Sequence, residues 1–274
     1  MDRKITNKVA GYQAVDGAGV NLVRVLGMGT MDEYDPILMM DSFDSTNPDD
    51  YTAGFPMHPH RGIETITYLA KGTIIHRDSL GHEETMKDGE IQWMNSGYGI
   101  MHEEILPPSD RLLGTQFWLN LPATDKMVKP TYKNITLEEI EEIEIDGGVL
   151  RLLAGRFKWH EGYQGAHVKI NFYDIELSEG KEVALDVDEA DNVLVFTLIG
   201  DAYVAGEFTK EKTAVKMSDG DTVRIAGAAG GSKVIFLSAK PLGEPRAWAG
   251  PIVMNTEEEL QEAFAELRNG TFVK

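Results

Sequence analysis

The sequence predicts an all-β protein of two β domains that ends in one α-helix. From Ala10 to Leu121, short apolar runs are broken by Gly, Asp, Asn and Pro, which is typical of strands and turns. A polar, proline-marked stretch follows, and after it comes a second set of strand-like runs. A chain of 274 residues also suits two domains of ordinary size.

The first half of the chain has apolar runs of strand length, as expected for a β-barrel or sandwich. They read NLVRVLG, PILMMDSF, ETITYLAKG, TIIHRDS, EIQWMNSG and GTQFWLNLP. Two turn signals lie between them, Lys71-Gly72 and Asp88-Gly89, because glycine tolerates positive φ and Asp-Gly favours tight turns. We expect a hairpin turn at each.

Residues 122 to 148 mark the boundary between the two halves. Their polar sequence predicts a connector with one short helix or charged strand, for which Thr136 and Glu139 form a weak capping box. The runs VLRLLAG, HVKINFYDIEL, NVLVFTLIG and KVIFLSA follow at similar spacing, which indicates a second β domain built like the first. We therefore place the domains at residues 1–130 and 131–274.

A helix is expected after Asn255, near the end of the chain. Thr256 and Glu259 form a capping box, acidic residues fill the first turn, and Gly270 can end the helix after Arg268. The apolar side chains of this segment fall on one stripe, so we expect it to dock on a domain; they are Leu260, Phe264 and Leu267.

The composition restricts both partners and metal chemistry. A net charge of -19 and a pI near 4.7 oppose contact with phosphate backbones and anionic lipids, so we expect no direct nucleic-acid binding and no membrane binding. The chain has no cysteine, which excludes disulfides and thiolate ligands and leaves imidazole and carboxylate as the strong metal ligands. The amino-terminal residues contain no apolar run of a secretory signal, and we expect a cytoplasmic protein.

Histidines are concentrated in one part of the chain. Five of the seven lie between positions 58 and 102: His58, His60, His76, His82 and His102. His58 and His60 are two residues apart, and so are His102 and Glu104. Because residues two apart on a strand share a face and lie about 6 to 7 Å from each other, the two pairs can meet around one ion.

The same spacing leaves a choice of carboxylate. Glu104 shares the face of His102 on a regular strand, whereas Glu103 points away and is a solvent-facing or supporting group. Glu64 lies four residues after His60, hence also on the ligand face, and is an alternative ligand.

The other histidines fit structural roles better. His76 is in an apolar run and is expected in the barrel wall, while His82, beside a glycine, is expected to face solvent. His160 and His167 have no partner two residues away, so we expect no metal in the second domain.

Proline and glycine residues that shape the backbone lie beside both pairs of possible ligands. Pro59 cannot donate a ladder hydrogen bond, so the His-Pro-His triplet is expected to begin a strand at the rim of the domain. Gly97 and Gly99, which precede His102, permit a bulge or a close backbone approach.

These motifs resemble those of the cupins, and more narrowly those of the pirin family. GFPMHPHRGIETITYLAKG resembles the first cupin metal motif and DGEIQWMNSGYGIMHEE the second, while HPHRGIETITYL, QWMNSGYGIMHEE and GPIVMNTEEEL resemble pirins. The resemblance covers nearly the whole chain. It implies a bicupin fold: two cupin-type β-barrels, a single metal in the amino-terminal domain, and a completing carboxy-terminal helix. Asn95 stands where the second cupin motif normally has proline, a departure typical of pirins.

The resemblance also implies a ligand set and an activity. It assigns His58, His60, His102 and Glu104 as ligands, usually of iron, whereas the general cupin pattern would use Glu64. We therefore expect one divalent metal, with Fe(II) favoured, although nitrogen and oxygen ligands also admit Mn, Ni, Cu and Zn. Several pirins are similar to quercetin 2,3-dioxygenases, which open a flavonol with O₂ and release carbon monoxide; here Glu104 would accept the proton of the substrate's 3-hydroxyl.

A rival function stays open at this point. Pirins of higher organisms resemble metal-dependent regulatory proteins that bind a protein partner such as a transcription factor, without catalysis. The acidic composition suits a basic partner but is also an ordinary solubility feature. A metal with only a structural role is a third reading, in which chelation lowers stability and changes nothing else.

Overall fold

The protein divides into two compact units in a computed structural model that describes all 274 residues. We call the unit with the five clustered histidines the histidine unit and the other the second unit. The histidine unit comprises Gln13–Leu22, Ile37–Thr136 and Leu242–Lys274. The second unit comprises Met1–Tyr12, Val23–Pro36 and Leu137–Pro241. Strands dominate both, which confirms the all-β prediction.

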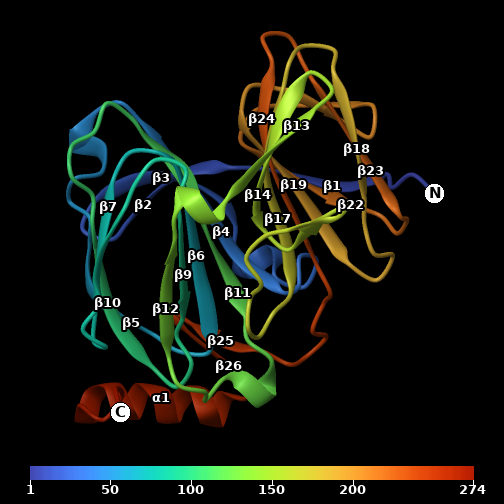
Figure 1. Cartoon of the computed structure of the whole chain (residues 1–274). Helices are drawn as coiled ribbons and strands as arrows, with labels where there is room; N and C mark the ends of the chain where they lie inside the picture. The colour runs from blue at the N-terminus through green and yellow to red at the C-terminus, as the bar shows by residue number, and fades with distance from the viewer. The chain divides into compact units, whose positions relative to one another are not determined.

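The histidine unit is built from two larger sheets and one small one (Figure 1). The seven-stranded sheet has the order β12 (Thr131–Ile135), β9 (Ile91–Asn95), β6 (Ile63–Lys71), β11 (Leu112–Asn120), β4 (Ile37–Ser45), β3 (Val20–Leu26) and β2 (Tyr12–Asp16). Of its last two strands, the residues within Gln13–Leu22 belong to this unit. The four-stranded sheet has the order β5 (Phe55–His60), β10 (Ile100–Ile105), β7 (Ile74–Asp78) and β8 (Glu83–Met86). The small sheet joins β25 (Ala247–Ala249) and β26 (Ile252–Met254). The two larger sheets face each other, so their inward side chains enclose an interior.

The inward side chains change character along the strands. One part of the interior is an apolar core drawn from both sheets: Val20, Leu22, Phe43, Tyr51, Leu69, Ile74, Met86, Leu106 and Leu112. Along β6 the inward positions alternate, so Thr67 points to the same side as Leu69. Thr67 pairs with Gln116 of β11 and with Gln92 of β9, and this polar row marks the part of the interior where the site lies.

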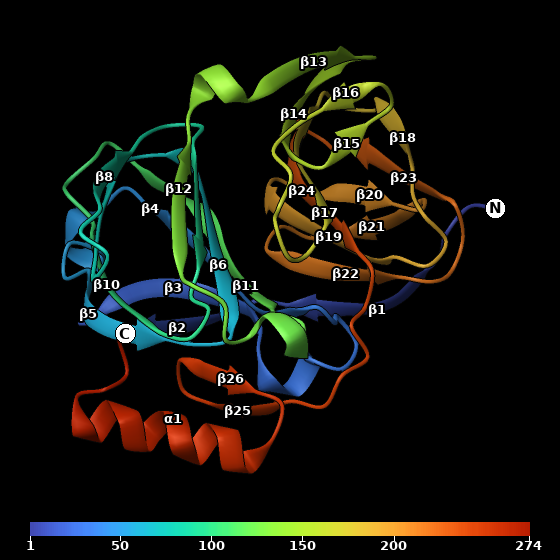
Figure 2. The ribbon, with the colours of Figure 1, turned by 60° about the horizontal axis from the view of Figure 1, so that its bottom comes forward.

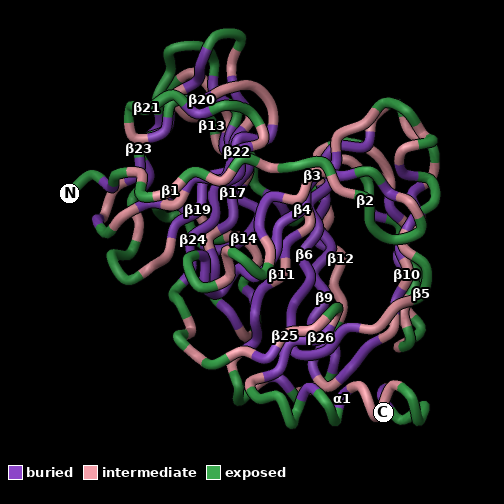
Figure 3. Tube along the Cα trace, turned by 180° about the vertical axis from the view of Figure 1, so that it is seen from behind, coloured by how far each residue is buried: buried purple, intermediate pink, exposed green.

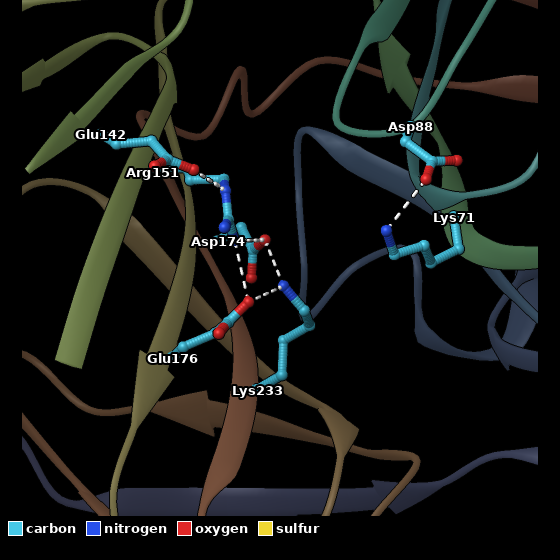
Figure 4. A network of polar contacts seen from close by, with 7 residues as sticks. All are labelled: Lys71, Asp88, Glu142, Arg151, Asp174, Glu176 and Lys233. Atoms are coloured by element: carbon cyan, nitrogen blue, oxygen red, sulfur yellow. Dashed lines mark hydrogen bonds and ion pairs between the residues drawn. The ribbon is translucent and has the colours of Figure 1, made fainter. Parts of the chain in front are cut away.

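The two expected hairpins are not hairpins. The turn at Gly72 joins β6 to β7 and the turn at Gly89 joins β8 to β9, and each connects strands of different sheets. Both glycines have positive φ, +114° and +81°, as turn residues often do. Asp88 ties the two turns together, because its carboxylate accepts hydrogen bonds from the Gly72 amide at 2.7 Å and from Lys71 Nζ at 2.9 Å (Figure 4).

The second unit repeats the arrangement of a seven-stranded and a four-stranded sheet. The first has the order β1 (Ile5–Ala10), β22 (Thr213–Met217), β19 (Asn192–Ile199), β24 (Ser232–Ala239), β17 (Ile170–Leu177), β14 (Gly148–Ala154) and β13 (Glu141–Ile145). The second has the order β18 (Glu182–Asp186), β23 (Thr222–Gly227), β20 (Ala202–Val204) and β21 (Glu207–Thr209). A short pair joins β15 (Arg156–Phe157) and β16 (His160–Glu161).

The interior of the second unit is apolar. Its core includes Leu152, Tyr173, Val195, Val215 and Phe236, which are at most 2% exposed. On the other face of β17, the buried carboxylate of Asp174 is held by two cations (Figure 4). These are Arg151 at 3.2 Å and Lys233 at 2.7 Å, so the buried charge is paired.

The units are not continuous in sequence, unlike the predicted domains 1–130 and 131–274. The amino-terminal strand β1 pairs with β22 of the second unit, and residues 242–274, helix included, belong to the histidine unit. The two ends of the chain join parts of the protein that are distant in the sequence. No local sequence pattern predicts such a unit boundary. The division at residue 130 describes the halves of the chain and stays a prediction.

Helix α1 (Glu257–Asn269) is where the sequence predicts it. Thr256 and Glu259 form a reciprocal capping box, and Gly270 ends the helix with φ of +71°. Four short 3-10 turns complete the chain: η1 (Met28–Thr30), η2 (Pro48–Asp50), η3 (Ala123–Asp125) and η4 (Leu137–Glu139). None of the helices has the length and apolar character needed to span a bilayer.

Candidate metal centre

Two antiparallel strands bring three histidines together. In the pairing of β5 with β10, His102 is directly opposite His58, and Ile100 is opposite His60. Pro59 lies between the two β5 histidines, which therefore share a face as expected of residues two apart. The result is a cluster in which possible ligand atoms of His58, His60 and His102 all lie within 4.8 Å of one another.

The hydrogen bonds of the β5 histidines leave their Nε2 atoms facing each other. The Nδ1 atom of His58 lies 2.9 Å from the carbonyl oxygen of Pro56, and Nδ1 of His60 lies 3.2 Å from that of Pro251. A carbonyl only accepts, so each Nδ1 carries the proton and each Nε2 presents a lone pair. These two Nε2 atoms are 3.1 Å apart. Two lone pairs at this separation repel each other unless a cation lies beside both.

His102 completes the cluster with unused ligand atoms. Its ring is 4.3 Å from the His58 ring and 5.0 Å from the His60 ring, measured between centroids. It is buried, and neither of its ring nitrogens has a hydrogen-bond partner within the protein. Buried polar atoms are normally satisfied, so two orphaned nitrogens on one ring point to a ligand of another kind.

The protonation states also suit a metal. Burial, together with the nearby His58, lowers the pKa of His60 to about 3, although the hydrogen bond to Pro251 works in the opposite direction. Burial and the neighbouring histidines hold the pKa of His102 well below its usual range. Both imidazoles are therefore neutral near pH 7, which is the form that binds a metal.

Glu104 projects from β10 on the same face as His102. It is 3% exposed, and its carboxylate is held by two amides rather than by a cation. Gln92 Nε2 donates to Oε1 at 3.2 Å, and Gln116 Nε2 lies 3.1 Å from each of the two oxygens. The three-histidine cluster does not include Glu104, which is held beside it by these amides. Its neighbour Glu103 points the other way, as predicted.

Glu64 does not share the ligand face, contrary to expectation. The parity count from His60 fails because β5 ends there and the chain turns at Gly62, with φ of +77°, before β6 begins in the other sheet. Thr67 accepts a hydrogen bond from the same amide that holds Glu104, so Thr67 faces the interior. Glu64, three residues earlier on the strand, faces the opposite side. This geometry favours Glu104 as the carboxylate of the site.

A second polar network lies against the first. The side chain of Asp78 is fully buried, and its carboxylate accepts hydrogen bonds from His76 Nε2 at 3.0 Å and from His82 Nδ1 at 2.8 Å. Burial raises the pKa of Asp78, but these bonds and two backbone amides outweigh it and lower the pKa to about 2. His76 lies across from Glu104 in the strand pairing, and its ring is 5.4 Å from that of His102. The network around Asp78 therefore packs against the three-histidine cluster and supports it.

The residues around Asp78 agree only in part with the sequence-based prediction. His76 is a buried barrel-wall histidine, as predicted, and His82 is 39% exposed but bonded rather than free. Asp78 was not among the predicted site residues. Its signal is the spacing itself, because His76 and Asp78 are two apart on β7 and share a face.

Several further inward polar atoms have no partner within the protein. They are His76 Nδ1, Gln92 Oε1, Trp118 Nε1, Tyr132 OH and Asn134 Oδ1. Burial, reinforced by nearby carboxylates, raises the pKa of Tyr132 above its usual range, so its hydroxyl stays a donor. Donors and acceptors left over in this way suit a polar small molecule in the interior.

The donor set fits a divalent transition metal. Three imidazoles and one carboxylate are nitrogen and oxygen ligands of the kind that iron, manganese, nickel, copper and zinc accept. His58, His60 and His102 would hold the ion, and Glu104, which shares the face of His102 on β10, is the carboxylate that would complete the set.

Known proteins show the same architecture. A family model described as Pirin matches residues 19–119, and one described as Pirin C-terminal cupin domain matches residues 172–273. A Pseudomonas aeruginosa protein, named provisionally as a quercetin 2,3-dioxygenase, is 37% identical and the match covers 98% of this chain and 97% of its own. Human pirin is 31% identical, with 97% of this chain and 93% of its own covered.

A solved structure agrees over nearly the full length. The crystal structure of quercetin 2,3-dioxygenase from Acinetobacter baumannii superposes with a TM-score of 0.92 at 30% identity, covering 99% of each chain. The fold prediction of two cupin barrels with a carboxy-terminal helix is thereby confirmed. Both family models and the full-length relatives lead to one conclusion: this chain belongs to the pirin family.

Proposed function

We propose that this protein is a metal-dependent dioxygenase that opens the ring of a flavonol such as quercetin with O₂ and releases carbon monoxide. The observation that carries the proposal is the cluster of three imidazoles with unused nitrogen atoms beside a buried, amide-held carboxylate. The likeness to the Acinetobacter enzyme supports the same substrate class. We take His58, His60, His102 and Glu104 as the metal ligands and Fe(II) as the metal; Mn, Ni, Cu and Zn suit the same donors.

The residues of the site have different roles in the proposed reaction. A bound metal would act as a Lewis acid toward the 3-hydroxyl of the flavonol. Glu104 accepts the proton of that hydroxyl, and Gln92 and Gln116 keep its carboxylate oriented before it does so. The unpartnered Tyr132 hydroxyl and Trp118 Nε1 can donate hydrogen bonds to other substrate oxygens.

The proposal is tested by anaerobic reconstitution. Protein freed of metal and then loaded with Fe(II) under nitrogen is mixed with quercetin, and air is admitted. We expect the flavonol absorption to disappear with release of one carbon monoxide per quercetin consumed, and we expect no change with the metal-free protein. Iron-loaded protein that leaves quercetin intact in air would contradict the dioxygenase.

A regulatory protein is the second candidate. The net charge of -19 favours a basic protein partner, and human pirin is a full-length relative. In this alternative, the state of the same metal centre would change the shape of a surface that binds the protein partner, and no reaction would be catalysed. The reconstitution experiment separates the two, because metal binding without quercetin turnover is what the regulatory reading expects.

A further inference from the structure

The conspicuous GPIVMNTEEEL motif has no part in the function proposed above. It begins a stretch, Gly250–Lys274, that we call the carboxy-terminal segment. The segment runs beside the residue that follows His60: Arg61 and Ile252 form a parallel bridge, and Val253 N donates to the Arg61 carbonyl at 3.1 Å. Figure 2 shows β25 and β26 between α1 and the ends of the barrel strands. A piece of chain about 190 residues away thus borders the metal cluster.

The segment supplies a hydrogen bond to a ligand. The carbonyl oxygen of Pro251 lies 3.2 Å from His60 Nδ1, which fixes the proton there and leaves Nε2 for the ion. Histidine ligands nearly always donate their second nitrogen to such an acceptor, and it sets both tautomer and ring orientation. His58 finds its acceptor two residues away at Pro56, whereas His60 depends on the carboxy-terminal segment.

A buried lysine holds this part of the segment in place. Lys126 is 1% exposed, and its ammonium donates to three oxygens: the Gly62 carbonyl at 2.8 Å, Asn120 Oδ1 at 2.7 Å and the Val253 carbonyl at 2.9 Å. It therefore joins the end of the His-Pro-His strand to the segment. A side chain at Gly62 would place its Cβ 2.0 Å from the Val253 carbonyl oxygen, so only glycine allows this approach.

A second clamp comes from the helix. Arg61, the neighbour of His60, is 2% exposed; it forms an ion pair with Glu266 of α1 and lies 4.3 Å over the Phe272 ring. Its guanidinium also donates to the Phe272 carbonyl at 3.3 Å. At Gly99 a Cβ would meet that same carbonyl oxygen at 2.7 Å. Figure 3 shows β26 buried and β25 partly buried, while the outer side of α1 is exposed.

We infer that the carboxy-terminal segment is a positioning element of the metal centre, with the Pro251 carbonyl orienting His60 and with Glu266 and Lys126 fixing that carbonyl. The inference rests on the proposed metal site. It makes Glu266 a positioning residue that acts through Arg61, although it belongs to the last helix of the chain. Loosening the segment weakens metal binding because His60 loses its fixed tautomer and orientation.

The test compares two glutamates of α1. Glu266→Gln removes the charge that pairs with Arg61, and Glu262→Gln removes the same charge from an exposed position of the same helix. With Co(II) as the probe, the dissociation constant is measured by competition with a chelator in the full-length protein. We expect about tenfold weaker binding for Glu266→Gln, and unchanged binding for Glu262→Gln. Lys126→Met is expected to weaken binding in the same direction.

A second measurement separates positioning from general destabilisation. In protein with ¹⁵N-labelled histidine, the ring nitrogen shifts report the tautomer of each imidazole, with or without metal. We expect His60 with its proton on Nδ1 in the unsubstituted protein and a mixture of tautomers in Glu266→Gln. Unchanged Co(II) affinity and an unchanged His60 tautomer in a variant with a lowered melting temperature would overturn the inference. Both readouts are independent of quercetin turnover, so absence of dioxygenase activity would refute the proposed reaction and leave this test decisive.

Discussion

Glu104→Gln is expected to lower quercetin turnover by about 10²- to 10⁴-fold, the usual contribution of a general base. The amide cannot accept the proton of the 3-hydroxyl, but it keeps the shape of the side chain. Metal is expected to stay bound through the three histidines, with reduced affinity. The measurement is kcat with quercetin at a metal content verified for each sample.

The neighbouring position gives a matched control. Glu103 is on the same strand but on the opposite face, where it forms a surface ion pair with Arg77 at 3.4 Å. Glu103→Gln removes the same charge and is expected to keep full turnover. If Glu104→Gln retained the turnover of the Glu103→Gln protein, the assignment of the base would be wrong.

His102→Ala is expected to abolish stoichiometric metal binding. Its ring lies against both β5 histidines, so its loss leaves two histidine ligands instead of three. A ligand at a hundred times its dissociation constant stabilises a protein by about 2.7 kcal/mol, and this metal-dependent rise in melting temperature should vanish in the variant. Elemental analysis and melting curves with and without metal provide the measurement.

The histidines of the second unit provide the comparison. His160 is bonded to Glu141 at 2.8 Å and has no place in the cluster, so His160→Ala is expected to bind metal like the unsubstituted protein. Normal metal content in His102→Ala would show that the ion is bound elsewhere.

The sequence predicts those features that depend on neighbours in the chain. The helix α1 begins and ends where its capping residues predict, because caps are local hydrogen bonds. Strand parity predicts that His58 and His60 share a face and that Glu103 and Glu104 do not. This holds because β5 is regular from His58 to His60, and β10 pairs regularly with β7 from His102 to Ile105.

The same reasoning fails where the chain leaves a strand or meets a distant segment. Strand parity predicts that Glu64 lies on the ligand face, which is wrong because the turn at Gly62 separates it from His60. The turns at Gly72 and Gly89 have hairpin residues, yet the strands they join pair with others, since pairing is decided by the whole sheet. The Pro251 carbonyl beside His60 could not be foreseen, because a backbone oxygen has no sequence signature.

The central claim is that His58, His60 and His102 hold one divalent metal. X-ray absorption spectroscopy of the zinc-loaded protein tests it most directly, since zinc binds the same donors and is stable in air. We expect one zinc per chain with three imidazoles at about 2.0–2.1 Å and the remaining positions filled by oxygen. A zinc coordinated by fewer than three imidazoles, or three imidazoles persisting in His102→Ala, would contradict the account.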